Sequence, residues 1–376
     1  MLNQLKSSLS RMITNSQGWK TNEKIIIFES DDWGSVRMPN KAVQNAFKEK
    51  GYDVISNPYC KFDTLANSDD LNSLFKVLRK YKDKDGNHAM ITANTVVANP
   101  IFSDIRASNF SDYNYEPFTE TLKDYYPKED VFSLWQEGID DNIFFPQFHG
   151  REHVNVPLWL ELLRNNNKAI TDAFDLKFWG VPEIFYPSNI QNLQAAFGSV
   201  KPNDVEFYRK SLVEGLNLFE KIFNFKSETF IANNYTWSDP LNNTLYENGI
   251  IGLQGMKYQK VPLSDGCGIK LRPKFTGKIN ELGQVYMVRN CVFEPSQMSK
   301  NFNNVDNCLS NITNAFFFNK PAIITSHRLN FIGVLSKENR DLNLIMLDKL
   351  IKTILEKWPD VIFMTSNQLA QKLHHK

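Results

Sequence analysis

Short apolar runs alternate with segments of helical periodicity along most of the chain. Lys24–Phe28 (KIIIF) and Pro321–Thr325 (PAIIT) are the clearest runs, and each has the length of one buried strand. The other expected strands are Ala89–Ala93, Asn142–Phe148, Thr229–Ala232, Ile250–Gly255, Tyr286–Val288 and Val361–Met364, and the expected helices include Pro157–Leu163, Pro240–Asn248, Asp341–Lys357 and a short one after Ser366. Compact apolar strands that alternate with helices predict an α/β fold whose parallel sheet is buried on both faces.

Residues 99–141 interrupt this alternation with an aromatic and acidic stretch. It is longer than a usual connection between two strands, so we expect an inserted segment with structure of its own. Its aromatic residues include Tyr113, Tyr115, Phe118, Tyr125, Tyr126, Phe132 and Trp135. A surface-packed subdomain is the leading interpretation, and a wall or lid whose aromatic rings stack on sugars is the alternative.

Composition and charge narrow the class of protein. The chain has 376 residues, 42% of them apolar, which suits one large domain or two of ordinary size. Its 43 basic and 42 acidic side chains give a formal net charge of +1, so nothing in the charge favours nucleic acid or an anionic membrane as a partner. The four cysteines are widely spaced and form no CxxC pair, which predicts reduced thiols. The sequence carries no signature of an oligomeric state.

Residues 1–23 are expected to form a helical extension, and residues 24–376 the main domain. Apolar residues from Leu2 to Ile13 recur at helical spacing, without the continuous apolar core of a signal peptide. A docked amphipathic helix is the leading interpretation, and a membrane-surface anchor is the alternative. No later stretch approaches the roughly 18 apolar residues of a membrane span, so we expect a cytoplasmic protein without a transmembrane segment.

Ionisable residues gather directly after three of the expected strands. His149 and His153 follow Asn142–Phe148, and a single helical turn there would bring both imidazoles to one face, where they can bind one ion. The chain has only six histidines, and two of them are in the C-terminal tail. Neutral imidazole is a common ligand of zinc and related ions. These two histidines are therefore candidate metal ligands.

Paired carboxylates and a third histidine complete this set. Asp31 and Asp32 follow the KIIIF strand, where two adjacent carboxylates repel each other unless a cation keeps both ionised. One carboxylate and two histidines make a three-ligand set that leaves positions open for water and substrate, and the other carboxylate is free to act as a base. His327 follows PAIIT at the corresponding strand end, which makes it a candidate catalytic residue.

The order of these three segments resembles the polysaccharide deacetylase (NodB-homology) family. More narrowly, ESDDWGSVRMP, FHGREHVN and SHRLNFIG resemble a bacterial branch of that family, and the resemblance extends from about Lys24 to Leu369. It implies a distorted (β/α) barrel of about seven strands, with the aromatic-rich segment inserted at about 99–141. It also implies a divalent metal ion, with zinc the expected one, and an N-acetylated sugar or glycan precursor as substrate.

By position, the resemblance implies a role for each of the five residues. Asp32, His149 and His153 would hold the metal, Asp31 would be the general base, and His327 the general acid. The family's Arg-Pro-Tyr-type motif, whose arginine orients the catalytic aspartate, has no clear counterpart at Ala232–Trp237, where it would be expected. Arg37, Arg151 and Arg328 are the candidates to supply that charge instead. The residues expected to line the substrate groove are Asn234, Tyr235, Trp237, Asn155, Asn330 and Arg328.

Two other functions stay open at this point. The first is a metal-dependent amide or ester hydrolase that acts on a small molecule on the same fold, because a fold does not determine a substrate. The second is a barrel that binds carbohydrate without catalysis. The presence of both aspartates and all three histidines favours an enzyme over the binding protein.

Overall fold

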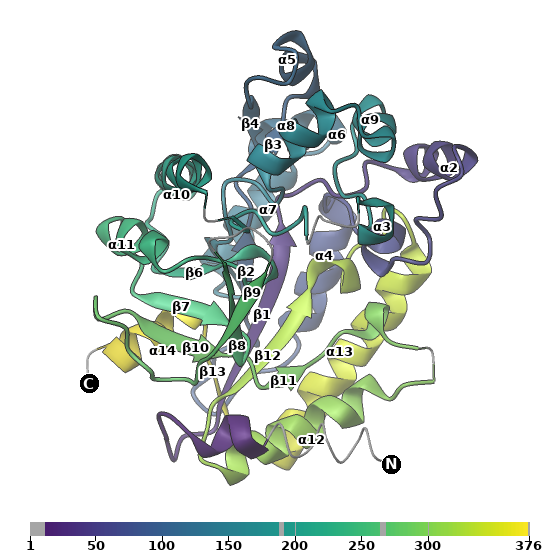
Figure 1. Ribbon diagram of the computed structural model, residues 1–376. Coiled ribbons are helices and arrows are strands. Elements are labelled where there is room, and N and C mark those ends of the chain that lie inside the picture. Colours follow the sequence, from purple (N-terminus) through teal and green to yellow (C-terminus); the bar gives the residue numbers. More distant parts are fainter. Residues whose placement is uncertain (1–11, 188–191, 200, 264–267, 300, 375–376) are drawn as a thin grey trace.

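A large parallel sheet runs through the centre of the molecule in the computed structural model, which describes residues 12–187, 192–199, 201–263, 268–299 and 301–374 (Figure 1). The hydrogen-bonded order is β10-β7-β6-β5-β2-β1-β12-β11, with β13 also paired to β1. The strands are β1 Ile25–Trp33, β2 Ile91–Thr95, β5 Phe144–Phe148, β6 Thr229–Ile231, β7 Gly252–Gly255, β10 Val285–Val288, β11 Cys291–Val292, β12 Ala322–His327 and β13 Ile362–Phe363. Every pairing in this sheet is parallel, which confirms the predicted α/β class.

The two end strands of this order are consecutive in the chain. Only Arg289 and Asn290 separate β10 from β11. The backbone N–H of Arg289 donates to the carbonyl of Gly255 beside β7, and that of Asn290 donates to the carbonyl of Ile323 in β12. The chain therefore passes from one end of the sheet to the other across two residues, and Arg289 lies at this junction.

Helices cover the sheet, and α12 and α13 lie side by side along one flank (Figure 1). The α-helices are α2 Lys41–Glu49, α3 Pro58–Phe62, α4 Ser68–Leu78, α5 Phe102–Ala107, α6 Phe118–Tyr125, α7 Val131–Asp140, α8 Val156–Arg164, α9 Lys168–Asp175, α10 Pro202–Phe223, α11 Pro240–Glu247, α12 Asn304–Phe317, α13 Lys337–Lys357 and α14 Ser366–His374. Short 3-10 turns span Glu183–Phe185, Asn233–Tyr235, Pro295–Gln297 and Arg328–Asn330. No helix in the described part of the chain is long and apolar enough to cross a membrane.

Alternating side chains give β1 two different faces. Ile25 and Ile27 belong to a buried apolar cluster that also contains residues of β10, β12 and α14. Ile26 and Phe28 point the other way, into the large core beneath the outer helices. Because side chains in a strand alternate, Glu29 and Asp31 share the face of Ile25 and Ile27. The side chains on that face therefore change from apolar to acidic toward the carboxyl end of the strand.

The aromatic segment 99–141 packs partly into the main core of the domain. It forms the antiparallel pair β3 (Ala98–Pro100) and β4 (Tyr115–Pro117), followed by α6 and α7. Trp135 of α7 is buried and makes edge-to-face contacts with Trp33 of β1 and Phe144 of β5. Phe118, Phe132 and Trp135 pack α6 and α7 into the main core, whereas Phe102, Phe110 and Tyr113 pack in a separate apolar cluster with residues of α8 and α9. The segment is thus divided between two clusters, which corrects the interpretation of a single surface-packed subdomain.

The described part of the N-terminal segment is docked on the domain. Residues 12–16 are helical, and the Lys320 ammonium donates to the carbonyls of Gln17 and Trp19. The predicted amphipathic helix falls largely on residues 1–11, which lie outside the described residues. Cys60 and Cys308 are buried free thiols and Cys291 is buried, while Cys267 lies outside the described residues.

A second antiparallel pair, β8 (Tyr258–Pro262) and β9 (Ile269–Pro273), follows β7. Neither this hairpin nor the β3–β4 pair was predicted from the apolar pattern. β9 is mostly exposed, and its sequence (IKLRP) has too few apolar residues to be recognised as a core strand. The hairpin extends from the carboxyl end of β7, which is the end of the sheet where the predicted site residues lie.

Candidate metal centre and active site

The two carboxylates of the candidate site lie inside β1, not after it as the sequence pattern predicted. The pairing of β1 with β2 shifts register between Ser30 and Trp33, and Asp32 has a positive φ of 74°. Such an irregularity turns side chains that would otherwise alternate, so Asp31 and Asp32 both line one cavity. A positive φ is costly for a residue other than glycine, and such strain is concentrated at functional sites.

Asp32, His149 and His153 form a compact cluster that can hold a metal ion. Asp32 Oδ1 lies 2.9 Å from His153 Nε2 and 3.4 Å from His149 Nε2. One ligand atom from each residue lies within 4.8 Å of the others, and all three residues are buried. Within the described ranges, no other group of three histidine, cysteine or acidic side chains meets this geometric criterion.

The hydrogen bonds of the two imidazoles suit metal binding. His149 Nδ1 lies 2.8 Å from the carbonyl oxygen of Ile231, and since a carbonyl only accepts, Nδ1 carries the proton. The other ring nitrogen of His149, Nε2, faces Asp32. Burial lowers the pKa of His153 to about 4, although Asp32 acts in the opposite direction, so the His153 ring is neutral at pH 7. Two imidazoles and one carboxylate are a ligand set that fits zinc and similar ions.

Residues 149–155 form an irregular loop before α8, and not the helical turn that we expected. Gly150 has a φ of +115°, and a Cβ at this position would lie 3.1 Å from the carbonyl oxygen of Glu152. Arg151 anchors the loop through ion pairs with Glu152 and with Glu214 of α10. The turn at Gly150, rather than helical spacing, brings His149 and His153 to the same ion position.

Arg289 holds Asp31 in a bidentate ion pair. Its Nη2 lies 2.6 Å from Asp31 Oδ1, and its Nη1 lies 2.7 Å from Asp31 Oδ2. Its Nε donates to Glu29 Oε2, and Glu29 in turn accepts from Ser366 Oγ. Burial raises the pKa of Asp31, but the Arg289 charge and hydrogen bonds, helped by His327 and His149, bring it down to about 2.

This pair corrects the expectation about the arginine beside the catalytic aspartate. None of the three arginines that we expected forms an ion pair with Asp31. Arg151 pairs with Glu152 and Glu214, and Arg328 pairs with Asp63. Arg37 donates to Gln194 instead. The positive charge beside Asp31 comes from Arg289. This residue directly follows β10, whose sequence gave the weakest strand signal, and it lies where the two ends of the sheet meet.

His327 is the last residue of β12, and its imidazole lies next to the Asp31 carboxylate. Its Nδ1 lies 2.5 Å from Glu294 Oε1, and its Nε2 lies 3.7 Å from Asp31 Oδ2. Burial lowers its pKa, but the charge and hydrogen bond of Glu294, with Asp31 and Asp32 nearby, raise the pKa to about 9. His327 is therefore an imidazolium at pH 7. Asn330 holds Glu294 in place by donating to its Oε2.

These groups surround a cavity of about 350 Å³. Its lining residues are Asp31, Asp32, Arg37, Tyr59, His149, His153, Gln194, Ala232, Asn234, Tyr235, Met256, Val292, Glu294, Gln297, Met298, Thr325 and His327. Asn234 and Tyr235, two of the expected substrate-binding residues, both have a positive φ. Tyr235 accepts a hydrogen bond from Arg289 Nη1 at 3.3 Å, so it also supports the Asp31 ion pair. No residue of 99–141 lines this cavity, so the segment is not a wall or lid over it.

The other four expected substrate-binding residues do not line the cavity, because each is buried in a structural role. Trp237 Nε1 donates to Asn242. Asn330 bonds Glu294 and Ser326, and Arg328 is wholly buried against Asp63. Asn155 is the N-cap of α8, where its side chain accepts from Leu158 N and from Tyr208 Oη.

The capping role of Asn155 gives a testable expectation. Asn155→Ala removes the cap and is expected to lower the free energy of unfolding by about 1 kcal/mol. Because Asn155 lies outside the cavity, metal content and substrate KM are expected to stay unchanged. Chemical denaturation measures the free energy of unfolding. The matched control is Asn40→Ala, which removes the N-cap of α2. A raised KM without loss of stability would return Asn155 to the substrate site.

Several residues of the cavity were not singled out from the sequence. Arg289 directly follows β10, and Glu294 lies two residues after β11. The rule that identified Asp31 and His327 would have identified both had these two strands been assigned from the sequence. Tyr59 comes from α3 and Gln297 from a 3-10 turn, and their positions depend on tertiary packing. Local sequence offers no signal for these last two.

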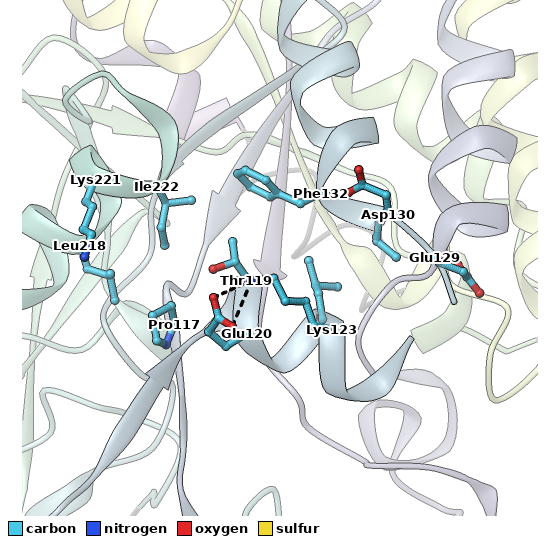
Figure 2. A pocket seen from close by; sticks show the side chains of 12 residues that line it. Pro117, Thr119, Glu120, Lys123, Glu129, Asp130, Phe132, Leu218, Lys221 and Ile222 are labelled. Atoms are coloured by element: carbon cyan, nitrogen blue, oxygen red, sulfur yellow. Dashed lines mark hydrogen bonds and ion pairs between the residues drawn. The ribbon is translucent and has the colours of Figure 1, made fainter. Parts of the chain in front are cut away.

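A second cavity of about 400 Å³ lies at α6, α7 and α10, away from these groups. Figure 2 shows Phe132, Leu218 and Ile222 among its lining residues, together with Lys123, Lys221 and Glu120. Lys123 and Glu120 form an ion pair within α6. The residues that line this second cavity include no histidine and no cysteine. Of these two cavities, only the one that contains Asp31 and His327 is lined by the candidate metal ligands and catalytic residues.

Comparisons with known proteins give only distant similarities. No family model matches the chain, and no curated protein matches it. Its fold is similar to that of a protein provisionally named a polysaccharide deacetylase from Mycobacterium smegmatis, with 10% identity, a TM-score of 0.47, and coverage of 96% of this chain and 93% of the other.

Two other solved structures are similar to a comparable degree. One is a 4-alpha-glucanotransferase from Thermococcus litoralis, with 10% identity, a TM-score of 0.46, and coverage of 93% of this chain and 40% of the other. Another is a probable polysaccharide deacetylase from Pseudomonas aeruginosa PAO1, with 9% identity, a TM-score of 0.44, and coverage of 94% and 92%. Similarities this weak assign neither a family nor an activity, so the function is argued from the residues of the cavity.

Proposed function

We propose that this protein is a metal-dependent hydrolase that removes N-acetyl groups from a sugar or glycan precursor, on a distorted (β/α) barrel. The observation that carries the proposal is the cluster of Asp32, His149 and His153, with a second carboxylate and an imidazolium beside it. The motif resemblance described above supports the N-acetyl sugar as the substrate class. For the fold, the seven parallel strands β1, β2, β5, β6, β7, β10–β11 and β12, joined end to end through Arg289 and Asn290, support a barrel.

Asp32, His149 and His153 would hold the metal ion. A divalent cation there supplies Lewis-acid polarisation of the acetyl carbonyl and acidifies a water molecule. Zinc is the expected ion, because two imidazoles and one carboxylate suit it and leave room for further ligands. All other steps are assigned to side chains of the cavity.

Asp31 acts as the general base in this proposal. It takes a proton from the water that attacks the acetyl carbonyl carbon, and Arg289 keeps its carboxylate ionised and fixed in orientation. Because the pKa of Asp31 is about 2, the carboxylate is fully ionised at neutral pH. A carboxylate ionised so firmly is a weak base, so a cation held by Asp32, His149 and His153 would supply most of the activation of the water.

His327 acts as the general acid. The carbon–nitrogen bond breaks, His327 donates its proton to the leaving nitrogen, and the products are acetate and a free amine. Glu294 holds the imidazolium through Nδ1, which leaves Nε2–H directed toward Asp31 and the cavity. The base and the acid thus face each other, as addition and elimination on a single acetamido group require.

The pH dependence of the rate tests this assignment. His327 has a raised pKa, so its proton is present below about pH 9 and is lost as the pH rises through that value. We expect kcat to fall about tenfold per pH unit above about 9, as for loss of a single essential proton. His327→Asn is expected to lower kcat and to abolish this alkaline limb. His88→Asn, which changes a histidine outside the cavity, should retain it, and a limb that survives in His327→Asn would reject the acid role.

The proposed activity itself is tested by acetate release. Zinc-loaded protein is incubated with a panel of N-acetyl sugars, chitooligosaccharides, small acetate esters and cyclic amides, with Asp31→Asn beside it. Release from N-acetyl sugars that depends on Asp31 supports the proposal. Turnover only of the esters or cyclic amides assigns a different hydrolase, and sugar binding without turnover of any compound assigns the non-catalytic alternative.

A further inference from the structure

We propose that Arg37 binds an anionic group, a carboxylate or a phosphate, on the compound that occupies the cavity. The substrate would then be an N-acetylated compound that carries a negative charge near its acetamido group. The identity of the reaction rests on the proposed function, whereas the anion site rests on contacts of Arg37 that do not depend on catalysis.

Arg37 differs from the other buried arginines of the described chain. Arg151, Arg289, Arg328 and Arg340 each form an ion pair with at least one carboxylate. Arg37 is 3% exposed and lines the cavity, yet no acidic side chain among the described residues lies within ion-pair distance of it. Its Nη2 donates to the neutral Gln194 Oε1 at 2.7 Å. Asp32 and Asp63 lie near enough for their charges to raise the pKa of Arg37, but neither is within ion-pair distance, so the guanidinium can still bind an anionic group of a ligand in the cavity.

Arg37 stands in the middle of one wall of the cavity. The His153 ring stacks on Trp179 at 5.8 Å, and the Arg37 guanidinium lies 5.7 Å from the Trp179 ring. On its other side the guanidinium lies 4.3 Å from the Tyr59 ring, which contacts the His327 ring at 5.3 Å. Tyr59, His153 and His327 line the cavity with Arg37, whereas Trp179 does not. These ring contacts place Arg37 between a candidate metal ligand and the proposed acid.

Tyr59 provides a second donor at the same place. Its hydroxyl oxygen accepts a hydrogen bond from Gln297 Nε2 at 3.1 Å, and no acceptor for its own proton occurs among the described residues. Burial, with Glu294 and Asp32 nearby, raises its pKa well above the usual value, so the hydroxyl keeps its proton. A guanidinium and a hydroxyl that both donate into one cavity match the acceptor oxygens of a carboxylate or phosphate.

The surroundings leave room for Arg37 in this position. A Cβ on Gly180 would lie 2.7 Å from Arg37 Cγ and 3.2 Å from a ring carbon of Phe178. Because Cγ is close to the backbone, it cannot move aside as the tip of the side chain could. Gly180 is thus required for the observed path of the Arg37 side chain, and Gly180→Ala is expected to displace the guanidinium without removing its charge.

The test compares a neutral N-acetyl sugar with charged relatives. The probes are N-acetylglucosamine, N-acetylglucosamine 1-phosphate, N-acetylmuramic acid and 2-acetamido-2-deoxyglucuronic acid, which place the anion at different positions on the same ring. Binding to the zinc-loaded full chain is measured by calorimetry, and KM and kcat are measured wherever acetate is released. The variants are Arg37→Gln, Arg37→Lys and Gly180→Ala, with Lys221→Gln as a charge-removing control outside the cavity.

We expect at least one charged probe to bind tenfold or more tightly than N-acetylglucosamine. Arg37→Gln should abolish that preference, Arg37→Lys should restore part of it, and Gly180→Ala should weaken it, because each change lowers the affinity for the charged probe more than the affinity for the neutral sugar. Preference for the carboxylate probes or for the phosphate probe decides between the two anions. The retained preference of Lys221→Gln shows that the effect is local.

Two results would overturn the anion site. One is equal binding of all charged and neutral probes by the wild type, and the other is a preference that survives Arg37→Gln. A fall in kcat for neutral and charged compounds alike would also overturn it, because Arg37 would then stabilise the reaction itself. Charge-dependent binding without any acetate release would leave the anion site standing while the deacetylase proposal fails. Acetate release without charge preference would support the deacetylase proposal while the anion site fails.

Discussion

Asp31→Asn is expected to lower kcat by about 10²–10⁴-fold, the range for loss of a general base. The substrate for this measurement is the compound that the acetate-release screen identifies. Asparagine fills the same space but cannot take a proton from water. KM is expected to change little, because the acetyl group and its sugar keep their other contacts. Steady-state kinetics on the zinc-loaded variant measures both constants.

Metal content separates this catalytic loss from a binding loss. Asp31 is held by Arg289 and Asn94 and is not part of the Asp32, His149 and His153 cluster. The zinc content of Asp31→Asn should therefore equal that of the wild type. If the variant lost its metal together with its activity, Asp31 would be a ligand, and the division of roles between the two aspartates would be wrong.

Arg289→Met is expected to destabilise the protein more than any other single change discussed for this site. It leaves Glu29 and Asp31 buried without their shared cation, and breaking a buried ion pair costs about 3–5 kcal/mol. Arg289→Lys should recover only part of this loss, because an ammonium cannot bind two oxygens of Asp31 and reach Glu29 in one plane. Urea denaturation at pH 7 measures the free energy of unfolding of all three proteins.

The same variants predict a shift in acid stability. The pKa of Asp31 is held at about 2 in the folded protein, below the value of 3.8 that serves as its unfolded reference, so its ionisation contributes stability above pH 3.8. That contribution is lost as the pH falls from 3.8 through about 2. Without Arg289, burial dominates and the pKa of Asp31 in the folded protein rises above 3.8, so the contribution of its ionisation to stability changes sign. Arg289→Met should therefore gain stability, relative to its own value at pH 7, as the pH falls toward 4. A stability difference between Arg289→Met and wild type that does not change with pH would reject this explanation.

Most of the sheet and the residues of the metal cluster could be predicted from the sequence. Runs such as KIIIF and PAIIT are apolar enough to identify buried strands, and parallel strands place their carboxyl ends at one edge. This explains why Asp32, His149, His153 and His327, which are far apart in the chain, could be grouped in advance. The helical turn assumed for His149 and His153 was wrong, because Gly150 permits a backbone turn that spacing alone does not reveal.

Arg289 and Glu294 show what local patterns miss. Their strands, β10 and β11, have only four and two residues, and together they bridge the two ends of the sheet. The partner of Arg289 is 258 residues away in sequence, so the ion pair depends on the whole sheet being formed. Asn155, Asn330 and Arg328 illustrate the opposite error. Polar residues near a site were interpreted as ligand-binding, although their side chains cap a helix, hold Glu294 or pair with Asp63.

Metal content tests the central claim most directly. Elemental analysis of purified wild type beside His149→Ala, after incubation with zinc and removal of excess ion, should give close to one zinc per chain in the wild type and a large loss in the variant. His88→Ala, outside the cluster, should retain the ion. A wild type that binds no zinc, or a His149→Ala variant that binds as much as wild type, would contradict the assignment of Asp32, His149 and His153 as a metal site.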